Sequence, residues 1–302
     1  MGSVETLVSL AGSVALLLFG LSLIRDGMDS AFGLRMKMIL GFGTRTPIRA
    51  FVAGLVATLG LQSSTATALL TASFIKRGMI EGGRAQIVLI GANVGTALTA
   101  LVLSAGLGAL APALVLLGYI LRKRKAVVPH GVGTALIGVG LMLVSLTLLE
   151  EATAPIRAST QLAAILPLLS DTPLLALVIS AGIALLCSSS LAAVLLVASL
   201  GLEPPLALVM VLGANLGGAI PAVLATMGEG VGSRRLTIGN LILRGFGCLL
   251  ALPFATELAA QLSRVPFGQF GFAVEAHLAF NLVLAVLAWP FATTAQRKAR
   301  GS

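Results

Sequence analysis

The chain has 302 residues, of which 57% are hydrophobic and only 10% are charged, and its mean hydropathy is +1.05. Because about a quarter of the residues in soluble domains are charged, this composition excludes an ordinary soluble domain and predicts an all-α polytopic membrane protein. The formal net charge of +9 is accompanied by only 5% aromatic residues, so we expect no stacking platform and no nucleic-acid partner.

Several apolar stretches along the chain approach the length of roughly 20 residues that spans a bilayer as a helix. They cover residues 4–24, 85–103, 107–121, 130–149, 205–227, 236–259 and 270–292. Shorter apolar segments come in two pairs, 47–60 with 62–75 and 172–186 with 188–201. Each pair predicts a helical hairpin that enters and leaves the bilayer on the same side. Residues 28–46 mix apolar and charged side chains, which favours a helix at the cytoplasmic interface over a simple loop.

Basic residues gather at the ends of these stretches and predict the orientation of the chain. No Lys or Arg precedes the first stretch, whereas residues 25–49 are rich in both, which places the N-terminus outside and this segment in the cytoplasm. The later basic residues that the same count places inside are Lys76, Arg77, Arg84, the run 122–125, Arg234, Arg235, Arg297, Lys298 and Arg300, and those outside are Arg157 and Arg264. Two full spans over 47–77 would preserve this count. We expect a multi-pass protein of the bacterial inner (cell) membrane with a cytoplasmic C-terminus.

A polar pattern occurs twice within the apolar sequence. The run Gln-Ser-Ser-Thr at 62–65 is followed by Gly-Ala-Asn-Val-Gly-Thr at 91–96, and the run Cys-Ser-Ser-Ser at 187–190 is followed by Gly-Ala-Asn-Leu-Gly-Gly at 213–218. The offset is 125 residues between the runs and 122 between Asn93 and Asn215. Because residues 4–24 and 130–149 have opposite predicted orientations, one duplication predicts two inverted-topology repeats. The predicted repeats are 1–125 and 126–302, each with a re-entrant helical hairpin, about 47–77 and about 172–201.

A broken helix at membrane depth leaves backbone groups unpaired unless protein, water or a ligand satisfies them. At a hairpin tip, the free N–H groups of a helix N-terminus and nearby hydroxyl groups favour an anion, while carbonyl and hydroxyl oxygens suit Na⁺. Small residues also let helices pack closely, which is the usual explanation for a single Ser-Ser or Gly-x-x-x-Gly. The repetition of the pattern at matching offsets favours a binding site.

At these residues the chain resembles the type II sodium-dependent phosphate cotransporter family, as a bacterial-type member without a soluble C-terminal domain. The resembling segments are 17–27, 62–71, 91–99 and the run Ala-His-Leu-Ala-Phe-Asn at 276–281. The resemblance implies phosphate bound between the hairpins, with sodium ions beside it. The implied substrate-binding residues are Gln62, Ser63, Ser64, Thr65, Ser188, Ser189 and Ser190, and the implied sodium-binding residues are Asn93, Thr96, Thr99, Asn215, Ser64 and Ser189.

Departures from the family pattern lie mainly in the second half. Cys187 stands where the family signature has Gln, and Gly218 and Pro221 stand where hydroxyl residues are usual, which puts the sodium stoichiometry in question. Asn240 and Arg244 stand in a segment where the family has His and Asn four residues apart. Arg244 is a further candidate for substrate binding, because its guanidinium could hold phosphate with two hydrogen bonds.

Other roles for these polar residues stay open at this point. Arg244 could instead pair with carbonyl groups or with Glu257, or extend to the interface. His277 and Asn281 lie on one helical face, where a hydrogen-bonded pair is favoured over proton coupling.

The sequence contains no metal-ligand cluster, no nucleotide-binding loop and no recognisable catalytic triad, so we expect no enzyme, no transition-metal site and no cofactor other than sodium as coupling ion. The predicted function is secondary active transport of inorganic phosphate coupled to a sodium gradient by alternating access. Two alternatives remain: a transporter of another oxyanion or small carboxylate, and a phosphate-binding membrane sensor without transport. A homo-oligomer is not excluded.

Overall fold

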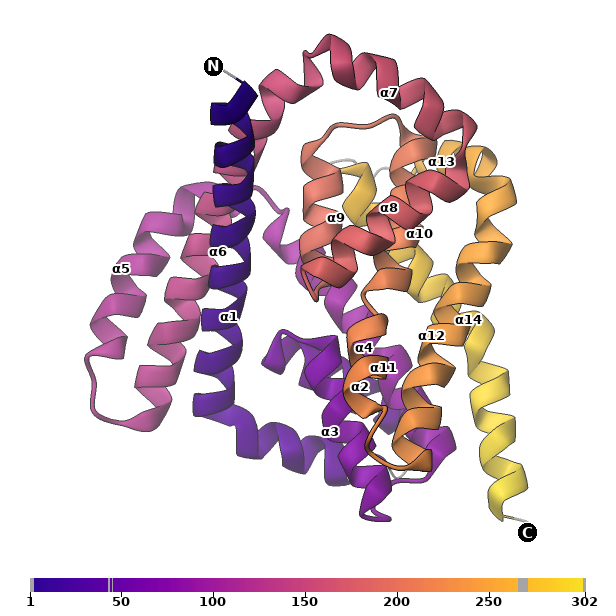
Figure 1. The fold of residues 1–302 in the computed structure, drawn as a ribbon. Coiled ribbons are helices and arrows are strands. Elements are labelled where there is room, and N and C mark those ends of the chain that lie inside the picture. Colours follow the sequence, from indigo (N-terminus) through magenta and orange to yellow (C-terminus); the bar gives the residue numbers. More distant parts are fainter. Residues whose placement is uncertain (1–2, 43, 45, 266–270, 301–302) are drawn as a thin grey trace.

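The computed structural model describes residues 3–42, 44, 46–265 and 271–300, and in these ranges the chain forms α-helices, two short 3₁₀ helices and no strand (Figure 1). The predicted all-α class is therefore confirmed. The helices before residue 126 are α1 (Ser3–Phe42), α2 (Pro47–Leu61), α3 (Ser64–Lys76), α4 (Gly82–Leu103), η1 (Leu107–Leu110) and α5 (Ala111–Arg122). Those after it are α6 (Val127–Arg157), α7 (Thr160–Asp171), α8 (Pro173–Leu186), α9 (Ser190–Ser199), α10 (Pro204–Gly217), α11 (Ile220–Thr226), α12 (Val231–Ala251), η2 (Leu252–Phe254), α13 (Ala255–Leu262) and α14 (Phe272–Arg300).

Six helical segments of the described chain are long and apolar enough to cross a membrane. They are Val4–Gly41, Gly82–Leu103, Val127–Arg157, Pro204–Thr226, Val231–Leu262 and Phe272–Pro290. The helix axis bends by 112° between α7 and α8, and these two helices count as a seventh segment only if the bent pair is one span. The chain is thus an integral membrane protein, as its composition predicts.

Residues 107–121, predicted as a span, belong to a shorter apolar helical segment, Leu107–Arg122, which is not among the six. A 3₁₀ turn, η1, occupies its start, and α5 has only 12 residues, which corresponds to a helix about 18 Å long against a bilayer core of about 30 Å. Helix α5 instead packs along α6 as a short hairpin at one side of the molecule (Figure 1).

The predicted interfacial helix at 28–46 is the second part of α1, which continues without a break to Phe42. Figure 1 shows that α1 descends through the molecule and then turns to run across it toward α3. Residues 43 and 45 of the predicted segment lie outside the described residues. The first span and the predicted surface helix are therefore one bent element.

Close glycine contacts join the two halves along α1 and α6. A Cβ atom on Gly27 would lie 2.4 Å from the carbonyl oxygen of Gly131, and one on Gly138 would lie 2.5 Å from that of Gly20. Because Gly20 faces Gly138 while Gly27 faces Gly131, the two helices run antiparallel. Small residues at such positions let helix backbones approach closely in a membrane, so side chains here would separate the halves.

Each predicted hairpin packs against the helix that carries the Gly-Ala-Asn motif. A Cβ atom on Gly91 of α4 would lie 2.0 Å from the carbonyl oxygen of Phe51 in α2, and one on Gly213 of α10 would lie 2.2 Å from that of Leu177 in α8. The same glycine of the motif thus makes the same backbone contact in both halves. In Figure 1, α2 and α3 lie in the lower part of the molecule and α8 and α9 in the upper part. The relation of the halves as inverted repeats remains a prediction.

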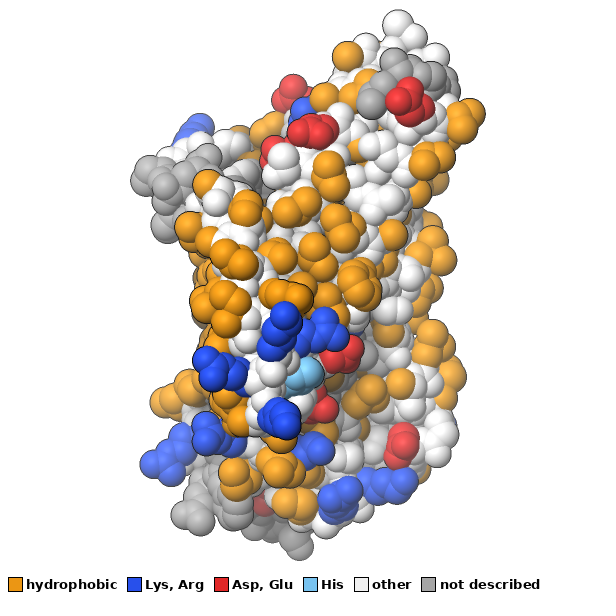
Figure 2. Space-filling model, turned by 90° about the vertical axis from the view of Figure 1, so that its left-hand side faces the viewer, with side chains coloured by type: hydrophobic (Ala, Val, Ile, Leu, Met, Phe, Trp, Pro, Cys, Tyr) orange, Lys and Arg blue, Asp and Glu red, His pale blue; other side chains and the backbone are white. Residues whose placement is uncertain are grey.

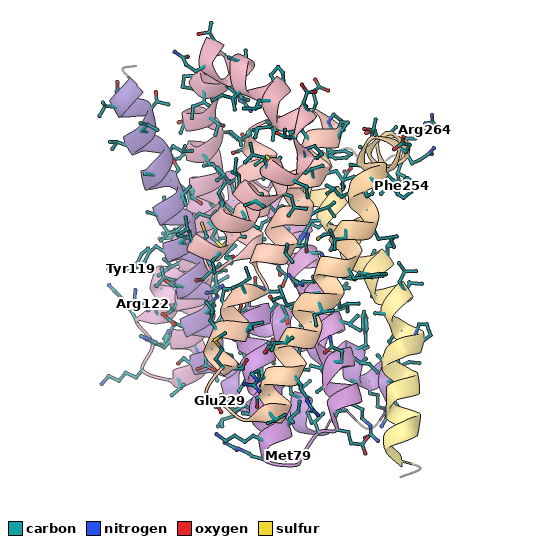
Figure 3. All side chains as sticks on the ribbon, turned by 45° about the vertical axis from the view of Figure 1, so that its right-hand side comes forward. Met79, Tyr119, Arg122, Glu229, Phe254 and Arg264 are labelled. Carbon is teal, nitrogen blue, oxygen red and sulfur yellow. The ribbon has the colours of Figure 1, made fainter. Side chains whose placement is uncertain are left out.

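Charged side chains differ between the two ends of the molecule. Lys and Arg gather toward the lower end in Figure 2, below a belt of exposed hydrophobic side chains. Figure 3 places Met79 and Glu229 at this end and Arg264 at the opposite one. Lys76 pairs with Glu229 at 3.0 Å, so the end of α3 is joined to the loop before α12. The side chains of Arg297, Lys298 and Arg300 lie outside the described residues.

Candidate functional site

The tips of the two hairpins have the same backbone conformation. Gln62, between α2 and α3, has φ 50°, and Ser188, between α8 and α9, has φ 48°. These are the only described residues other than glycine with positive φ, a region that residues with a side chain adopt uncommonly. The next residue in each tip, Ser63 or Ser189, is extended, with φ −157° and −156°.

Ser63 and Ser189 also have the same capping role. Each side-chain oxygen accepts a hydrogen bond from a backbone N–H in the first turn of the following helix, that of Ala66 at 3.1 Å and that of Ala192 at 3.2 Å. Serine is among the best residues at this position because it satisfies one of the free N–H groups of the helix. The hydroxyl hydrogen of each serine is not used in this bond and can be donated to a ligand.

The match between the two tips corrects the predicted alignment by one residue. Gln62 corresponds in conformation to Ser188, at an offset of 126, and not to Cys187. Cys187 is the C-cap of α8 and stays in the right-handed helical region, with φ −73° and ψ −9°. Within this chain, the residue that corresponds to Gln62 is therefore Ser188, which offers a hydroxyl group.

A small cavity lies between the two tips and contains most of the predicted site. Predicted residues that line it are Gln62, Ser63, Ser64, Thr65, Thr96, Thr99, Ser188, Ser189 and Ser190. The other lining residues are Arg25, Thr58, Leu191 and Gly218. The lining is rich in hydroxyl groups and contains no carboxylate, and both α3 and α9 begin at it. Their N-termini add partial positive charge, so the cavity suits an anion.

Arg25 was missed as a site residue from the sequence. Arg25 follows an apolar stretch and precedes Asp26, a pattern typical of a charged residue at the end of a span. In the structure α1 continues to Phe42, so Arg25 lies inside a longer helix. Its Nε donates to the carbonyl oxygen of Gln62 at 3.3 Å. This contact orients the guanidinium along the first tip and brings a full positive charge to the cavity.

Thr58 is the other polar residue that the sequence analysis did not select. Its hydroxyl group donates to that of Thr67 at 2.9 Å, and the Thr67 hydroxyl in turn contacts the carbonyl oxygen of Ser63 at 3.1 Å. The three residues tie the end of α2 to the start of α3. No repeated motif marks Thr58, because the residue 126 positions later is Ala184.

The glycine in place of a hydroxyl residue at 218 has a steric explanation. A Cβ atom on Gly218 would lie 2.6 Å from the Cβ atom of Ser190. Its counterpart in the first half, Thr96, lines the cavity with a hydroxyl group. In the second half, Ser190 of α9 fills that space, and the polar lining is asymmetric as a result.

Arg244, the further substrate candidate, lines a neighbouring pocket and not the cavity itself. That pocket shares Ser64, Thr65 and Gly218 with the cavity. The Arg244 side chain is 2% exposed and lies between the two asparagines of the repeated motif. Its Nη1 donates to the carbonyl oxygen of Asn215 at 2.6 Å, and its Nη2 donates to the side-chain oxygen of Asn93. Of the predicted partners it therefore uses carbonyl groups, and no contact with Glu257 is seen among the described residues.

Asn215 lies outside both pockets, unlike the other predicted sodium ligands. Its side-chain oxygen accepts from Asn281 at 3.0 Å, and its amide nitrogen lies 3.0 Å from Nδ1 of His277. Asn281 also donates to the carbonyl oxygen of His277 at 2.7 Å, so the predicted hydrogen-bonded contact between these two residues is confirmed. In this conformation the Asn215 side chain joins α10 to α14. The contact of Asn215 with a positive charge is made by its backbone carbonyl, which accepts from Arg244.

The polar tips, the repeated helix motif and the cavity between them can be compared with known proteins. Residues 16–151 match the Na⁺/Pi-cotransporter family. The matched segment runs from within α1 nearly to the end of α6, and it includes Arg25, the first hairpin and Asn93. The resemblance noted from the motifs is confirmed by this match.

Relatives extend the similarity to the second half. The chain is 35% identical over 291 residues to the Escherichia coli K12 protein named "Putative inorganic phosphate export protein YjbB", and 35% identical over 292 residues to the Salmonella typhimurium protein of the same name. Each alignment covers 95% of this chain and 54% of the relative, so the chain spans about half the length of these relatives. It is 25% identical to YqeW of Bacillus subtilis, with 94% of both chains covered. No solved structure matches the chain.

Proposed function

We propose that this chain is a secondary active transporter that couples the movement of inorganic phosphate to a sodium gradient by alternating access. The observation that carries the proposal is the cavity between two hairpin tips of matching conformation, which is lined by hydroxyl groups and Arg25. The match to the Na⁺/Pi-cotransporter family and the phosphate named in its E. coli relative support phosphate as the substrate.

Phosphate would lie between the N-termini of α3 and α9. Free N–H groups at the two helix starts and the hydroxyl groups of Ser63 and Ser189 can each donate a hydrogen bond to a phosphate oxygen. Arg25 would supply the matching full charge. Because the donors come from both halves, a bound anion would hold the two tips together, which suits a site that opens to one side at a time.

Sodium would be bound beside the anion by neutral oxygens. Thr96 and Thr99 line the cavity from α4, and Ser64 lines it from the start of α3. Hydroxyl and backbone carbonyl oxygens are suitable ligands for a hard cation, and a bound sodium ion would offset part of the phosphate charge at membrane depth. We propose sodium as the only coupling ligand of the transporter.

We further propose that the protein lies in the bacterial cell membrane with its N-terminus outside, so that the basic lower end faces the cytoplasm. The direction of net movement then follows from both gradients. A symporter moves phosphate inward when the sodium gradient dominates and outward when the outward phosphate gradient exceeds it, which accommodates export as in the name of YjbB.

Replacing Ser63 or Ser189 with Ala should weaken phosphate uptake by about 10-fold or more, because each change removes a donor to a charged ligand that contributes roughly 1.5–3 kcal/mol. Each change also removes a helix cap, at a cost of about 1 kcal/mol. Initial rates of labelled phosphate uptake into proteoliposomes, measured against phosphate concentration, would show the loss as a raised KM.

One further variant separates ligand binding from helix capping, and another serves as a control. Ser189→Asp keeps the cap, because Asp accepts the same N–H bond, but places a negative charge at the cavity and should abolish uptake. Ser73→Ala changes a serine of α3 whose hydroxyl group, within the described part of the chain, bonds only the carbonyl oxygen of Leu70, and this variant should transport normally. Wild-type uptake by both Ser63→Ala and Ser189→Ala would remove the hairpin tips from the site.

A further inference from the structure

The Arg244 guanidinium joins the two halves at one point. It comes from α12 and donates to Asn93 on α4 and Asn215 on α10, which are the equivalent residues of the two Gly-Ala-Asn motifs. Asn240, one turn earlier on α12, accepts a hydrogen bond from the Asn93 amide nitrogen at 3.0 Å. That bond turns the Asn93 side-chain oxygen toward Arg244. The buried cation therefore contacts both motifs at once.

The oxygens around Arg244 are of the kind that bind sodium. They are a side-chain amide oxygen and a backbone carbonyl oxygen, and both are neutral. Among the described residues, no carboxylate lies within ion-pair distance of Arg244. Its Nε has no hydrogen-bond partner there either. The charge is therefore stabilised by dipoles alone, as an ion is in a transporter site.

A buried positive charge without a counter-charge is costly at membrane depth, which makes a functional role the first hypothesis for it. The Arg244 pocket shares Ser64 and Thr65 with the cavity, so the positive charge acts on the cavity across the first hairpin tip. A cation at this place favours an anion between the tips without touching it.

Hydroxyl ligands near the cavity are unequal in the two halves. Thr96 and Thr99 follow the first motif, whereas Gly218 and Pro221 stand at the corresponding positions after the second. The second half thus has fewer oxygens for a mobile ion in the region where Arg244 donates to the Asn215 carbonyl.

We propose that Arg244 is a resident cation: its guanidinium occupies the position of a coupling ion between the two Asn motifs, so the transport cycle uses one sodium ion fewer than a site with neutral residues there would need. The part of this inference that concerns the number of sodium ions in the transport cycle rests on the proposed function. The occupation of a cation position by Arg244 can be tested without transport.

The test compares wild type with Arg244→Gln, which keeps a hydrogen-bonding side chain without charge, and Arg244→Lys, which keeps the charge. Thermal unfolding of purified protein is followed as NaCl replaces choline chloride at constant ionic strength. The Gln variant should gain a sodium-specific rise in Tm over that of wild type, of about 2–4 °C at roughly five times the dissociation constant. The Lys variant should respond as wild type does.

Sodium should also restore the folded yield of Arg244→Gln if that variant unfolds in choline. In proteoliposomes, the Hill coefficient for sodium activation of phosphate uptake should rise by about one in the Gln variant and stay unchanged in the Lys variant. Equal sodium responses of all three proteins, or a Gln variant that sodium fails to restore, would overturn the proposal. Because unfolding needs no phosphate, these results stand apart from a failure of phosphate uptake in the wild type.

Discussion

Arg25→Gln is expected to abolish phosphate uptake, with a fall in apparent affinity of about 100-fold or more. Arg25 is the one positively charged side chain that lines the cavity in the described structure, and its Nη atoms are not used in the bond to Gln62. Two charge-assisted hydrogen bonds contribute roughly 1.5–3 kcal/mol each, and 1.36 kcal/mol corresponds to a factor of ten. Binding of labelled phosphate to purified protein measures the loss directly.

The matched variants for this prediction lie at the same position and on the same helix. Arg25→Lys keeps the charge but loses the planar fork, so it should retain part of the affinity. Arg35→Gln removes an exposed arginine that lies over the ring of Phe32, 5.7 Å from its centroid, and it should bind phosphate as wild type does. A folded Arg25→Gln protein with wild-type affinity would exclude Arg25 from the site.

Gly91→Ala and Gly217→Ala should each destabilise the protein by about 3 kcal/mol or more. The new Cβ atom would lie 2.0 Å from the carbonyl oxygen of Phe51 in the first case and 2.0 Å from that of Ala181 in the second. Overpacking costs typically 1–3 kcal/mol where side chains can adjust, and here the obstacle is helix backbone. Thermal unfolding in detergent and the folded yield by size-exclusion chromatography measure the effect.

Gly182→Ala is the control for these two variants. Gly182 lies in α8, and a Cβ atom there would meet nothing within 4 Å, so the change should be neutral or stabilise the helix by up to about 1 kcal/mol. Equal stability of the three variants would contradict the close contact between each hairpin and the helix behind it.

The hydroxyl runs and the hairpins were predictable from sequence because polar residues in an apolar chain are conspicuous. Ser63 and Ser189 were selected from their type and repetition, and the structure brings both to one cavity. The equivalence of Gln62 and Ser188 was not predicted, because the second polar run begins one residue before its tip residue, so a comparison of letters aligns Gln62 with Cys187. The backbone conformation of the two tips reveals it.

Long-range contacts account for what the sequence could not supply. Arg25 reaches the cavity because α1 continues past it and packs near the first tip, and nothing next to Arg25 in the sequence indicates this. Arg244 was recognised as unusual at membrane depth, but its partners lie 151 and 29 residues away in the chain. Residues 107–121 were predicted as a span, because apolar composition does not show where a 3₁₀ turn takes the place of α-helix.

The most direct test of sodium-coupled phosphate transport is labelled phosphate uptake into proteoliposomes that contain the purified protein. One set receives an inward sodium gradient, and in the other K⁺ replaces Na⁺ on both sides. The proposed mechanism predicts that phosphate accumulates above its external concentration only with the sodium gradient. Absence of accumulation by folded and inserted protein, or equal uptake in sodium and potassium, would contradict it.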